Sequence, residues 1–527
     1  MSQINKKYDS IQQRIYNIDE ILLKSNLKNT SPLYEINNAT HTEKFEGNQK
    51  RTDDAHSLDT RYALNKQTLK FENVIEQLNS EILYIKSGSF GSIFCAKIHS
   101  KTDQTIIENT VAIKITAFSK REGYGSINNI MRPENTEICM LKLLSYFVIK
   151  KYTPHLILPI STFNTNIKTF IDIWDDGTID KIRQDSGGQY IKNNKGEYVE
   201  FALKYIKDKD AEGKFIEKKK MFFVNEIGDY VLKNKVDISK VKVKRSDFIA
   251  ITNNSEYYIR NYDEELLIIT KDEYDTLKRK FQNPSERYRK VNNKYDEFVK
   301  NYKKGYFNDT VSVLITEWAD RGDLSTFLKK INRPNDLPNY EKLTLIQWQC
   351  LFFQFISTIA IIQHKYESFR HNDCKLNNIL ISKIQNPNYQ TLYPVGNDQY
   401  IVPNIGYCIY LWDFDFACIP GVINNKKLHK KWTFNANIKP VKNRYYDIHY
   451  FFCTLVYKGF IPEIMSSINV PQEVKNFINW VIPYEYRPLP INKHKVDTDK
   501  CRLLVDDEVH LPINILKHEF FSSFRKK

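Results

Sequence analysis

The most apolar stretch of this chain is Leu345–Gln363, and a segment of this kind must be buried either in a membrane or inside a protein. Three amide side chains interrupt it, at Gln347, Gln349 and Gln354. Amides are costly in hydrocarbon but find hydrogen-bond partners in a protein core. We therefore predict a long core helix over Leu343–Tyr366 and no transmembrane segment.

Length and composition place the chain among soluble folded proteins. It has 527 residues, 41% of them hydrophobic, which is enough for a substantial core. The N-terminal sequence MSQINKKYDS lacks the apolar core of a secretory signal, so we expect an intracellular protein. The eight cysteines are scattered, without a C-x-x-C pair or a zinc-type Cys/His spacing, and we expect reduced thiols.

After a polar N-terminal region, predicted strands come first along the chain and predicted helices follow. The strand patterns begin at Ile82 and continue at Ser92–Ile98, Thr110–Thr116, Leu156–Thr162 and Val311–Glu317. Helical periodicity covers Tyr8–Leu27 and Leu69–Leu83 in the polar region, then Glu134–Lys150 and Leu343–Tyr366. This order predicts an α+β protein with two lobes.

A long segment, residues 164–308, separates two of these strands. It mixes charged residues with Tyr and Phe, and contains strand-like runs at Tyr198–Leu203, Lys220–Val224 and Phe248–Ile251 and a charged helical stretch at Glu273–Lys304. A segment of this length is not a structureless loop, so we predict an inserted subdomain.

The formal net charge of +15 suits an acidic partner. Within the insertion, Lys278–Lys304 would be the centre of a surface for such a partner. The alternative is a Lys-rich solvated surface, which we favour because the chain has no long unbroken Lys/Arg run of the nucleic-acid-binding type. Nucleic-acid binding stays open.

A glycine-containing turn joins the first two predicted strands. Gly88, Ser89, Gly91 and Ile93 lie in it. Glycines at such a turn let backbone N–H groups approach phosphate oxygens without a Cβ clash. Hairpin turns with glycine are common, however, so this signal is weak by itself.

The next strand carries the sequence V-A-I-K, which ends at Lys114. A lysine that faces a cleft from a strand is costly unless it is paired. Glu137 on the following predicted helix is the natural partner, and Glu134 is a less well placed alternative. Taken alone, the pattern would fit an ordinary strand with an exposed lysine.

Two acidic motifs follow the insertion. The sequence H-N-D-C-K-L-N-N-I-L starts at His371 and contains Asp373, Lys375 and Asn378. The sequence L-W-D-F-D-F-A contains Asp413. A carboxylate is suited to Mg²⁺, because a hard cation selects oxygen ligands.

These motifs, in this order, resemble those of the eukaryotic-type protein kinase superfamily: V-A-I-K, H-R-D-x-K-x-x-N-I-L and L-x-D-F-G-x-A. The resemblance covers about residues 82–162 and 311–456. The short C-terminal region, the sequence N-x-x-Y-D-I-H-Y-F-F from Asn443 and the Asn/Lys/Ile-rich composition are similar to divergent serine/threonine kinases of large DNA viruses, of the poxvirus type.

The resemblance implies an α+β, bilobal protein kinase-like fold and an ATP- and Mg²⁺-dependent serine/threonine protein kinase. Asp373 would accept or orient the substrate hydroxyl proton and Lys375 would neutralise the γ-phosphate, while Asn378 and Asp413 would hold the metal. ATP would be bound by Gly88, Ser89, Gly91, Ile93, Lys114 and Glu137, and by the backbone of Glu317 and Ala319 in a hinge-like segment. Asp447 would brace the catalytic loop.

The implied domain division follows the motifs. Residues 1–80 would be a polar extension, partly helical; 81–165 and 309–345 the N-lobe and hinge; 166–308 the inserted subdomain; and 346–527 a shortened C-lobe. The implied partner is a protein substrate, and the location is the host cytoplasm or the virion if the protein is viral.

Three departures from the family pattern carry expectations. Asn372 replaces the Arg that normally meets a phosphorylated activation loop, so we expect activity that does not need that phosphorylation. Asp415 replaces the glycine of D-F-G, so we expect poor binding of inhibitors that need that segment to flip. No A-P-E sequence follows, and only 33 residues separate Asp413 from Asp447, so we expect a C-lobe that is shortened where ordinary protein kinases bind peptide substrates.

Two alternatives remain beside a protein kinase. A small-molecule kinase of the aminoglycoside or choline kinase type shares H-x-D-x-x-x-x-N and lacks A-P-E, but commonly lacks a lysine at the position of Lys375. A pseudokinase scaffold would bind nucleotide without turnover. The complete set of metal and phosphate ligands argues against the scaffold.

Overall fold

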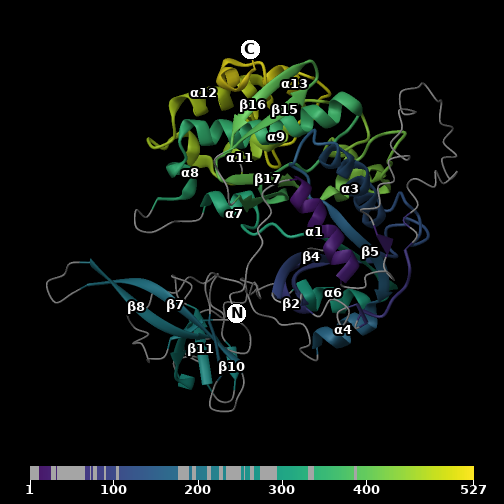
Figure 1. Cartoon of the computed structure of the whole chain (residues 1–527), viewed down its shortest axis with the longest axis vertical. Coiled ribbons are helices and arrows are strands. Elements are labelled where there is room, and N and C mark those ends of the chain that lie inside the picture. Colours follow the sequence, from purple (N-terminus) through teal and green to yellow (C-terminus); the bar gives the residue numbers. More distant parts are fainter. Residues whose placement is uncertain are drawn as a thin grey trace. The chain divides into compact units, whose positions relative to one another are not determined.

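The computed structural model describes the residues drawn in colour in Figure 1: 11–24, 31–32, 64, 66–71, 73–74, 80–87, 91–101, 106–175, 189–192, 198–209, 215–224, 230–232, 251–253, 256–260, 266–272, 294–329, 337–384, 389–457 and 459–526. The chain divides into two compact units. The first comprises Met1–Ser80, Ala96–Phe170 and Tyr306–Lys527, and the second comprises Glu81–Cys95 and Ile171–Gly305.

An antiparallel sheet forms one part of the first unit. Strand β13 (Phe307–Glu317) lies between β4 (Ile106–Ser119) and β5 (Pro159–Asn166), and the short β1 (Ser31–Pro32) pairs with the far edge of β5. The strand order continues from β4 to β3 (Gly91–Lys101), which is divided between the two units, and to β2 (Ser80–Ser87), which belongs to the second unit from Glu81 onward. The central strands are buried along most of their length, which explains their rich content of Val and Ile.

Helix α3 (Pro133–Ile149) packs on β4 and β5 and begins at a proline, whose fixed φ suits the first helical turn. Almost every residue of α3 is buried. The N-terminal helix α1 (Ile11–Lys24), drawn in purple in Figure 1, packs on α3. The sequence therefore predicted α1 and α3 correctly, to within a few residues at each end.

Helix α9 (Leu345–Lys365) forms the core of the helical part. Thr344 caps it through a capping box with Gln347. Within the described residues it is the one helix long and apolar enough to cross a membrane, and 78% of its apolar window is buried in the fold. It packs on α12 (Gln472–Val481), α13 (Pro512–Ile515) and the last 3-10 helix (Glu519–Phe524). Figure 1 shows α12 and α13 near α9. The prediction of a core helix is confirmed.

The first unit contains further helices and strands. The helices are α7 (Leu324–Lys329), α8 (Asn339–Lys342), α10 (Lys431–Asn435) and α11 (Tyr446–Val456). The strands form two hairpins, β14 (Ile379–Lys383) with β17 (Tyr407–Leu411) and β15 (Gln390–Val395) with β16 (Asp398–Pro403). Of these strands, β15 and β17 pack on α9. Short 3-10 helices cover Leu376–Asn378, Phe414–Phe416, Lys426–His429, Pro462–Met465, Tyr484–Tyr486 and Pro490–Asn492.

The second unit contains a seven-stranded sheet in the order β10-β11-β12-β9-β8-β7-β6. Its strands are β6 (Gln189–Lys192), β7 (Tyr198–Lys209), β8 (Phe215–Val224), β9 (Tyr230–Leu232), β10 (Ile251–Asn253), β11 (Glu256–Arg260) and β12 (Leu266–Ile269). Helix α4 (Ile167–Asp175) leads into this unit, and α6 (Lys294–Lys303) lies near its end. The domain boundaries within the chain stay a prediction.

Several predicted elements can be compared directly. The strands at Tyr198–Leu203 and Lys220–Val224 are confirmed within β7 and β8, whereas most of Phe248–Ile251 and residues 273–293 lie outside the described residues. The predicted helix Leu69–Leu83 is wrong at its end, because Ser80 already belongs to strand β2.

The mixture of helices and antiparallel sheets confirms the α+β class. All eight cysteines are buried and none forms a disulfide, as expected for reduced thiols.

Candidate active site

Lys114 and Glu137 form a buried ion pair between the sheet and a helix. Lys114 lies on β4 opposite Leu314 of β13, and Glu137 lies on α3. The Nζ atom of Lys114 donates to both carboxylate oxygens of Glu137, at 2.7 and 2.9 Å. The predicted partner is thus in place, while Glu134 pairs with Arg132 instead.

Asp413 adds a second carboxylate to Lys114. Its Oδ1 atom lies 2.9 Å from the same Nζ, so one ammonium group joins residues of three separate segments. Asp413 follows β17 with a φ of 66°, in the left-handed region. A non-glycine residue held there carries strain of about 1–3 kcal/mol, and such strain is commonly stored at functional sites.

The pKa values of Lys114, Glu137 and Asp413 are shifted by burial and by the charges of the other two groups. Burial opposes the charge on Lys114, but the attraction of Asp413 and Glu137 outweighs it and raises the pKa of Lys114. Burial raises the pKa of Glu137 to about 7, although Lys114 acts in the opposite direction. Burial also opposes the charge on Asp413, yet Lys114 holds the pKa of this carboxyl below its usual range. Asp413 is therefore the carboxylate that stays ionised.

Asp373, Lys375 and Asn378 form the second cluster. The Asp373 Oδ2 atom accepts hydrogen bonds from Nζ of Lys375 and from Nδ2 of Asn378, each at 2.8 Å. Asn378 also donates to the backbone carbonyl of Asp373 at 3.0 Å. A five-residue spacing can close this loop because a 3-10 turn, Leu376–Asn378, follows Lys375.

Asp447 braces the loop, as the sequence predicted. Its two carboxylate oxygens accept the backbone N–H groups of His371 and Asn372, at 2.7 and 2.8 Å. The side chain is completely buried on α11. Both carboxylate oxygens accept a hydrogen bond, so helix α11 holds the loop that carries Asp373 in place.

Backbone hydrogen bonds connect the two clusters. The N–H of Trp412 donates to the carbonyl of Asn378 at 3.1 Å, and Nε2 of His371 donates to the carbonyl of Trp412 at 3.0 Å. Asp413 therefore follows directly on a residue that is bonded to the loop of Asp373. His371 therefore has a structural role, because its ring holds the backbone of Trp412.

The predicted hinge residues lie at the end of β13. Glu317 donates its backbone N–H to Leu158, and its side chain forms an ion pair with Arg14 of α1. Ala319 is buried, and its carbonyl accepts the N–H of Gly322. The side-chain partner of Glu317 was not foreseen from the sequence.

The glycine turn is only partly described. Gly88 and Ser89 lie outside the described residues. Gly91 and Ile93 lie on β3 and are half-buried, and they belong to the second compact unit. Their relation to Lys114 stays a prediction.

The two unusual positions near the site have specific partners. Asn372 has a φ of 65° and donates from its buried amide to the carbonyl of Phe416 at 3.0 Å. Asp415 forms an ion pair with Lys427, and its backbone carbonyl accepts a bond from Asn425 at 2.8 Å. Both contacts tie the segment after Asp413 to its surroundings without a phosphate.

Arg502 is the residue of this site that the sequence interpretation missed. Its Nη2 atom lies 2.7 Å from Oδ1 of Asp373, although the two are 129 positions apart. No motif surrounds Arg502, and an isolated arginine in a single sequence carries no signal of such a contact.

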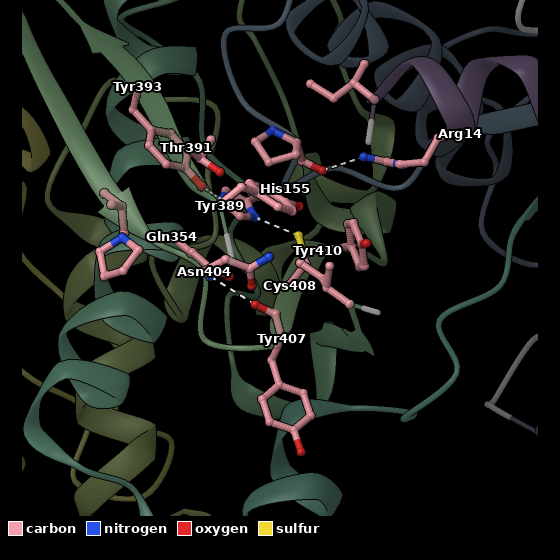
Figure 2. Close-up of a pocket in the computed structure, with 15 residues that line it drawn as sticks. Arg14, His155, Gln354, Tyr389, Thr391, Tyr393, Asn404, Tyr407, Cys408 and Tyr410 are labelled. Atoms are coloured by element: carbon pink, nitrogen blue, oxygen red, sulfur yellow. Dashed lines mark hydrogen bonds between the residues drawn. The ribbon is translucent and has the colours of Figure 1, made fainter. Parts of the chain in front are cut away.

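Figure 2 shows a pocket that is distinct from these two clusters. His155 lies in its lining, between the hydroxyl of Tyr393 at 2.8 Å and the thiol of Cys408 at 3.2 Å. Burial lowers the pKa of His155 to about 3 and raises the pKa of Cys408 to about 11, so neither group is an activated base or nucleophile. None of the predicted site residues lines this pocket.

Comparison with known proteins places the chain among viral protein kinases, as three of its matches show. Residues 337–511 match a family profile described as poxvirus serine/threonine protein kinase. A protein of Acanthamoeba polyphaga mimivirus, provisionally named a serine/threonine-protein kinase, is 32% identical over 467 residues, which are 88% of this chain and 73% of that protein. Serine/threonine-protein kinase 2 of variola virus is 28% identical over 217 residues, which are 41% of this chain and 42% of that protein.

Proposed function

Since this chain belongs to the poxvirus-type family of viral serine/threonine protein kinases, we propose that it transfers the γ-phosphate of ATP to serine and threonine hydroxyls of protein substrates. The observation that carries the proposal is the position of Lys114, whose ammonium group is shared by Glu137 and Asp413. We also propose the bilobal arrangement of the family for the first unit.

Lys114 would bind the phosphates of ATP. Phosphoryl transfer depends mainly on positioning and on neutralisation of charge. Glu137 orients the lysine from the side of α3, at 2.7 Å. Because its ammonium group remains charged in this buried setting, Lys114 supplies a fixed positive charge to an anionic ligand.

The residues present fit a magnesium ion. Within the described residues no group of three or more His, Cys, Asp or Glu is arranged to hold a metal. A Mg²⁺ ion bound through one or two protein oxygens, phosphates and water needs no such group. Asp413 offers an ionised carboxylate, and Asn378 turns its Nδ2 toward Asp373, which leaves its amide oxygen as a ligand. When bound, the ion would neutralise charge on the phosphates.

Asp373 would orient the attacking hydroxyl group. A new bond forms between the hydroxyl oxygen and the γ-phosphorus as the bond to the β-phosphate oxygen breaks, and the hydroxyl proton passes to Asp373. Lys375, which is 2.8 Å from the same carboxylate, would stabilise the transferred phosphoryl group. The backbone of Glu317 and Ala319 would bind adenine, and the turn containing Gly88, Ser89, Gly91 and Ile93 would cover the phosphates.

The contact between Lys375 and Asp373 favours a protein kinase over a small-molecule kinase. Small-molecule kinases of similar fold commonly lack a lysine at this position, and here it is part of the hydrogen-bonded cluster. The ionised pair of Lys114 and Asp413 favours catalysis over a nucleotide-binding scaffold. The basic insertion would offer a surface to acidic protein partners, and the protein would act in the host cytoplasm or the virion.

Labelled ATP with Mg²⁺ tests the substrate class. The purified full chain is offered a panel of generic proteins and, separately, a panel of small hydroxyl compounds. We expect labelled phosphoserine or phosphothreonine in protein, and no label when Asp413 is replaced in Asp413→Asn. Asp398→Asn is the matched control, because Asp398 pairs with the exposed Lys517 and belongs to neither cluster of the candidate site. Label confined to small molecules, or ATP binding without any transfer, would contradict the proposal.

A further inference from the structure

Arg502, on the C-terminal segment, reaches the loop that carries Asp373. Its Nη2 atom binds Oδ1 of Asp373 at 2.7 Å, and Nη1 donates to the carbonyl of Asn372 at 2.6 Å. Nη1 also donates to the hydroxyl of Tyr446 at 3.1 Å, and the guanidinium lies 4.2 Å from the centre of the Tyr450 ring. One guanidinium group thus joins the loop to helix α11.

This ion pair is buried on both sides. The side chains of Arg502 and Asp373 are 8% and 7% exposed. A buried ion pair repays its desolvation only where the geometry is good and further hydrogen bonds satisfy both groups. Here the planar fork of Arg502 uses both terminal nitrogens, an arrangement that the ammonium of a lysine does not reproduce.

The segment that carries Arg502 is itself fixed. Val496 and Leu503 pair as a short antiparallel bridge, and Asp497 donates its N–H to the carbonyl of Arg502 at 2.8 Å. Cys501 has a φ of 57°, so the backbone immediately before Arg502 is held in a strained conformation. Val496, Cys501 and Leu503 are fully buried. The segment is therefore part of the core.

The two oxygens of Asp373 have different partners. Oδ1 is bound by Arg502, whereas Oδ2 is bound by Lys375 and Asn378. Donors on both oxygens fix the plane of the carboxylate. The partner of Oδ2, Lys375, is 28% exposed at its side chain, whereas the partner of Oδ1, Arg502, is 8% exposed, so Oδ2 is bound by the more exposed of the two basic side chains.

We infer that Arg502 is a positioning residue, which holds Oδ1 of Asp373 so that Oδ2 faces the substrate hydroxyl. The inference rests on the proposed function and adds the C-terminal segment 496–504 to the apparatus of that site. An inhibitory segment would have to leave the site when the enzyme becomes active. Arg502 instead bonds Asn372 and Tyr446 in the core behind the loop, which supports alignment of Asp373 and not inhibition.

Three variants of the full chain test this inference: Arg502→Met, which keeps length and loses the charge; Arg502→Lys, which keeps the charge and loses the fork; and Arg502→Ala. Misplacement of a reacting group by about 1 Å can reduce a rate about 100-fold, and we expect a loss of that size in kcat for Arg502→Met. The KM for ATP should change less than about twofold, because Arg502 acts through Asp373 and not on nucleotide. Arg502→Lys should recover only part of the activity.

Two controls separate alignment from loss of folding. Arg444→Met removes another arginine of the same region, which pairs with Glu508 at 2.9 Å, and should leave kcat unchanged. Added methylguanidinium should restore part of the kcat of Arg502→Ala, a rescue that a purely structural defect would not show. The thermal midpoint of each variant, with and without ATP and Mg²⁺, establishes that the compared proteins are folded and bind nucleotide.

The outcomes are distinct. A folded Arg502→Met enzyme with unchanged or higher kcat would overturn the inference alone, and higher kcat would indicate inhibition by the arginine. A loss that appears wholly in the KM for ATP would also overturn it. A wild-type chain that transfers no phosphate would overturn the proposed function, and the inference with it.

Discussion

Arg14 of helix α1 forms a two-point ion pair with Glu317 at the end of β13, with Nε to Oε1 at 2.9 Å and Nη2 to Oε2 at 2.6 Å. The guanidinium also donates to the carbonyls of Pro154 and Leu156, each at 2.6 Å. The N-terminal helix is thereby bound to the segment in which we propose that adenine is held.

Replacing Arg14 should destabilise the first unit. In Arg14→Ala the half-buried Glu317 carboxylate loses its cation and two carbonyls lose their donor, and we expect a loss of about 3 kcal/mol of unfolding free energy, the lower end for a broken buried ion pair. Urea unfolding measures the loss. The control Lys442→Ala, in an exposed pair with Glu367, should cost less than about 1 kcal/mol. Equal effects of the two changes would contradict this account.

Replacing Lys114 should strongly reduce phosphate transfer. Lys114→Met removes the charge that we assign to the phosphates, and we expect kcat/KM to fall at least about 100-fold, as for removal of a preorganised electrostatic group. Lys517→Met, which alters an exposed pair with Asp398, is the control. Steady-state transfer rates measure both, and retention of most activity in Lys114→Met would be inconsistent with the proposed site.

The raised pKa of Glu137 predicts a pH dependence of stability. Burial raises this pKa from 4.5 to about 7, so the folded state holds the proton more tightly than the unfolded chain. The resulting stabilisation is complete below about pH 4.5 and is lost as the pH rises through about 7. The pKa of Asp413 is lowered from 3.8, so its contribution to stability has the opposite sign. That contribution is present above about pH 3.8 and is lost as the pH falls further.

Unfolding free energies of the wild-type chain and Glu137→Gln, measured at several pH values between about 5 and 8, isolate this contribution. We expect the wild type to lose stability relative to the variant as the pH rises. A constant difference in unfolding free energy, or one that changes in the opposite direction, would show that burial does not raise the pKa of Glu137.

Treatment with phosphatase should leave the activity unchanged. Arg370, two positions before Asn372, binds the carbonyls of Val441 and Asn437 at 3.1 and 2.6 Å, and Asn372 binds Phe416. These hydrogen bonds hold the segment after Asp413 in place through uncharged carbonyl acceptors. Arg370 therefore does not need a phosphate group as its partner. Transfer rates before and after treatment test this, and a tenfold or greater loss would refute it.

The sequence was sufficient where chemistry is encoded at short, fixed spacing. Asp373, Lys375 and Asn378 lie close together in the sequence, and their side chains are hydrogen-bonded to one another. Lys114 pairs with the predicted partner Glu137. The long apolar run of α9 could be assigned to the core because its amides need partners, and Gln354 donates to the carbonyl of Tyr407 at 3.2 Å.

Contacts between distant segments could not be predicted in this way. Arg14 and Glu317 are 303 positions apart, and Arg502 and Asp373 are 129 apart, so neither pair leaves a periodic pattern in one sequence. Local ambiguity explains the wrong end of the predicted helix Leu69–Leu83. The run around Ile82 has apolar residues at spacings that suit both a helix and a strand, and pairing within the sheet selects the strand.

The most direct test of the central claim compares the wild-type chain with Asp373→Asn, a change that keeps size and removes the carboxylate. Phosphoamino-acid analysis with labelled ATP is combined with a measured Kd for ATP and Mg²⁺. We predict phosphoserine or phosphothreonine for the wild type, a loss of at least about 100-fold in the variant, and similar Kd values for both. Equal transfer by the two proteins would contradict the role of Asp373 and the active site built around it.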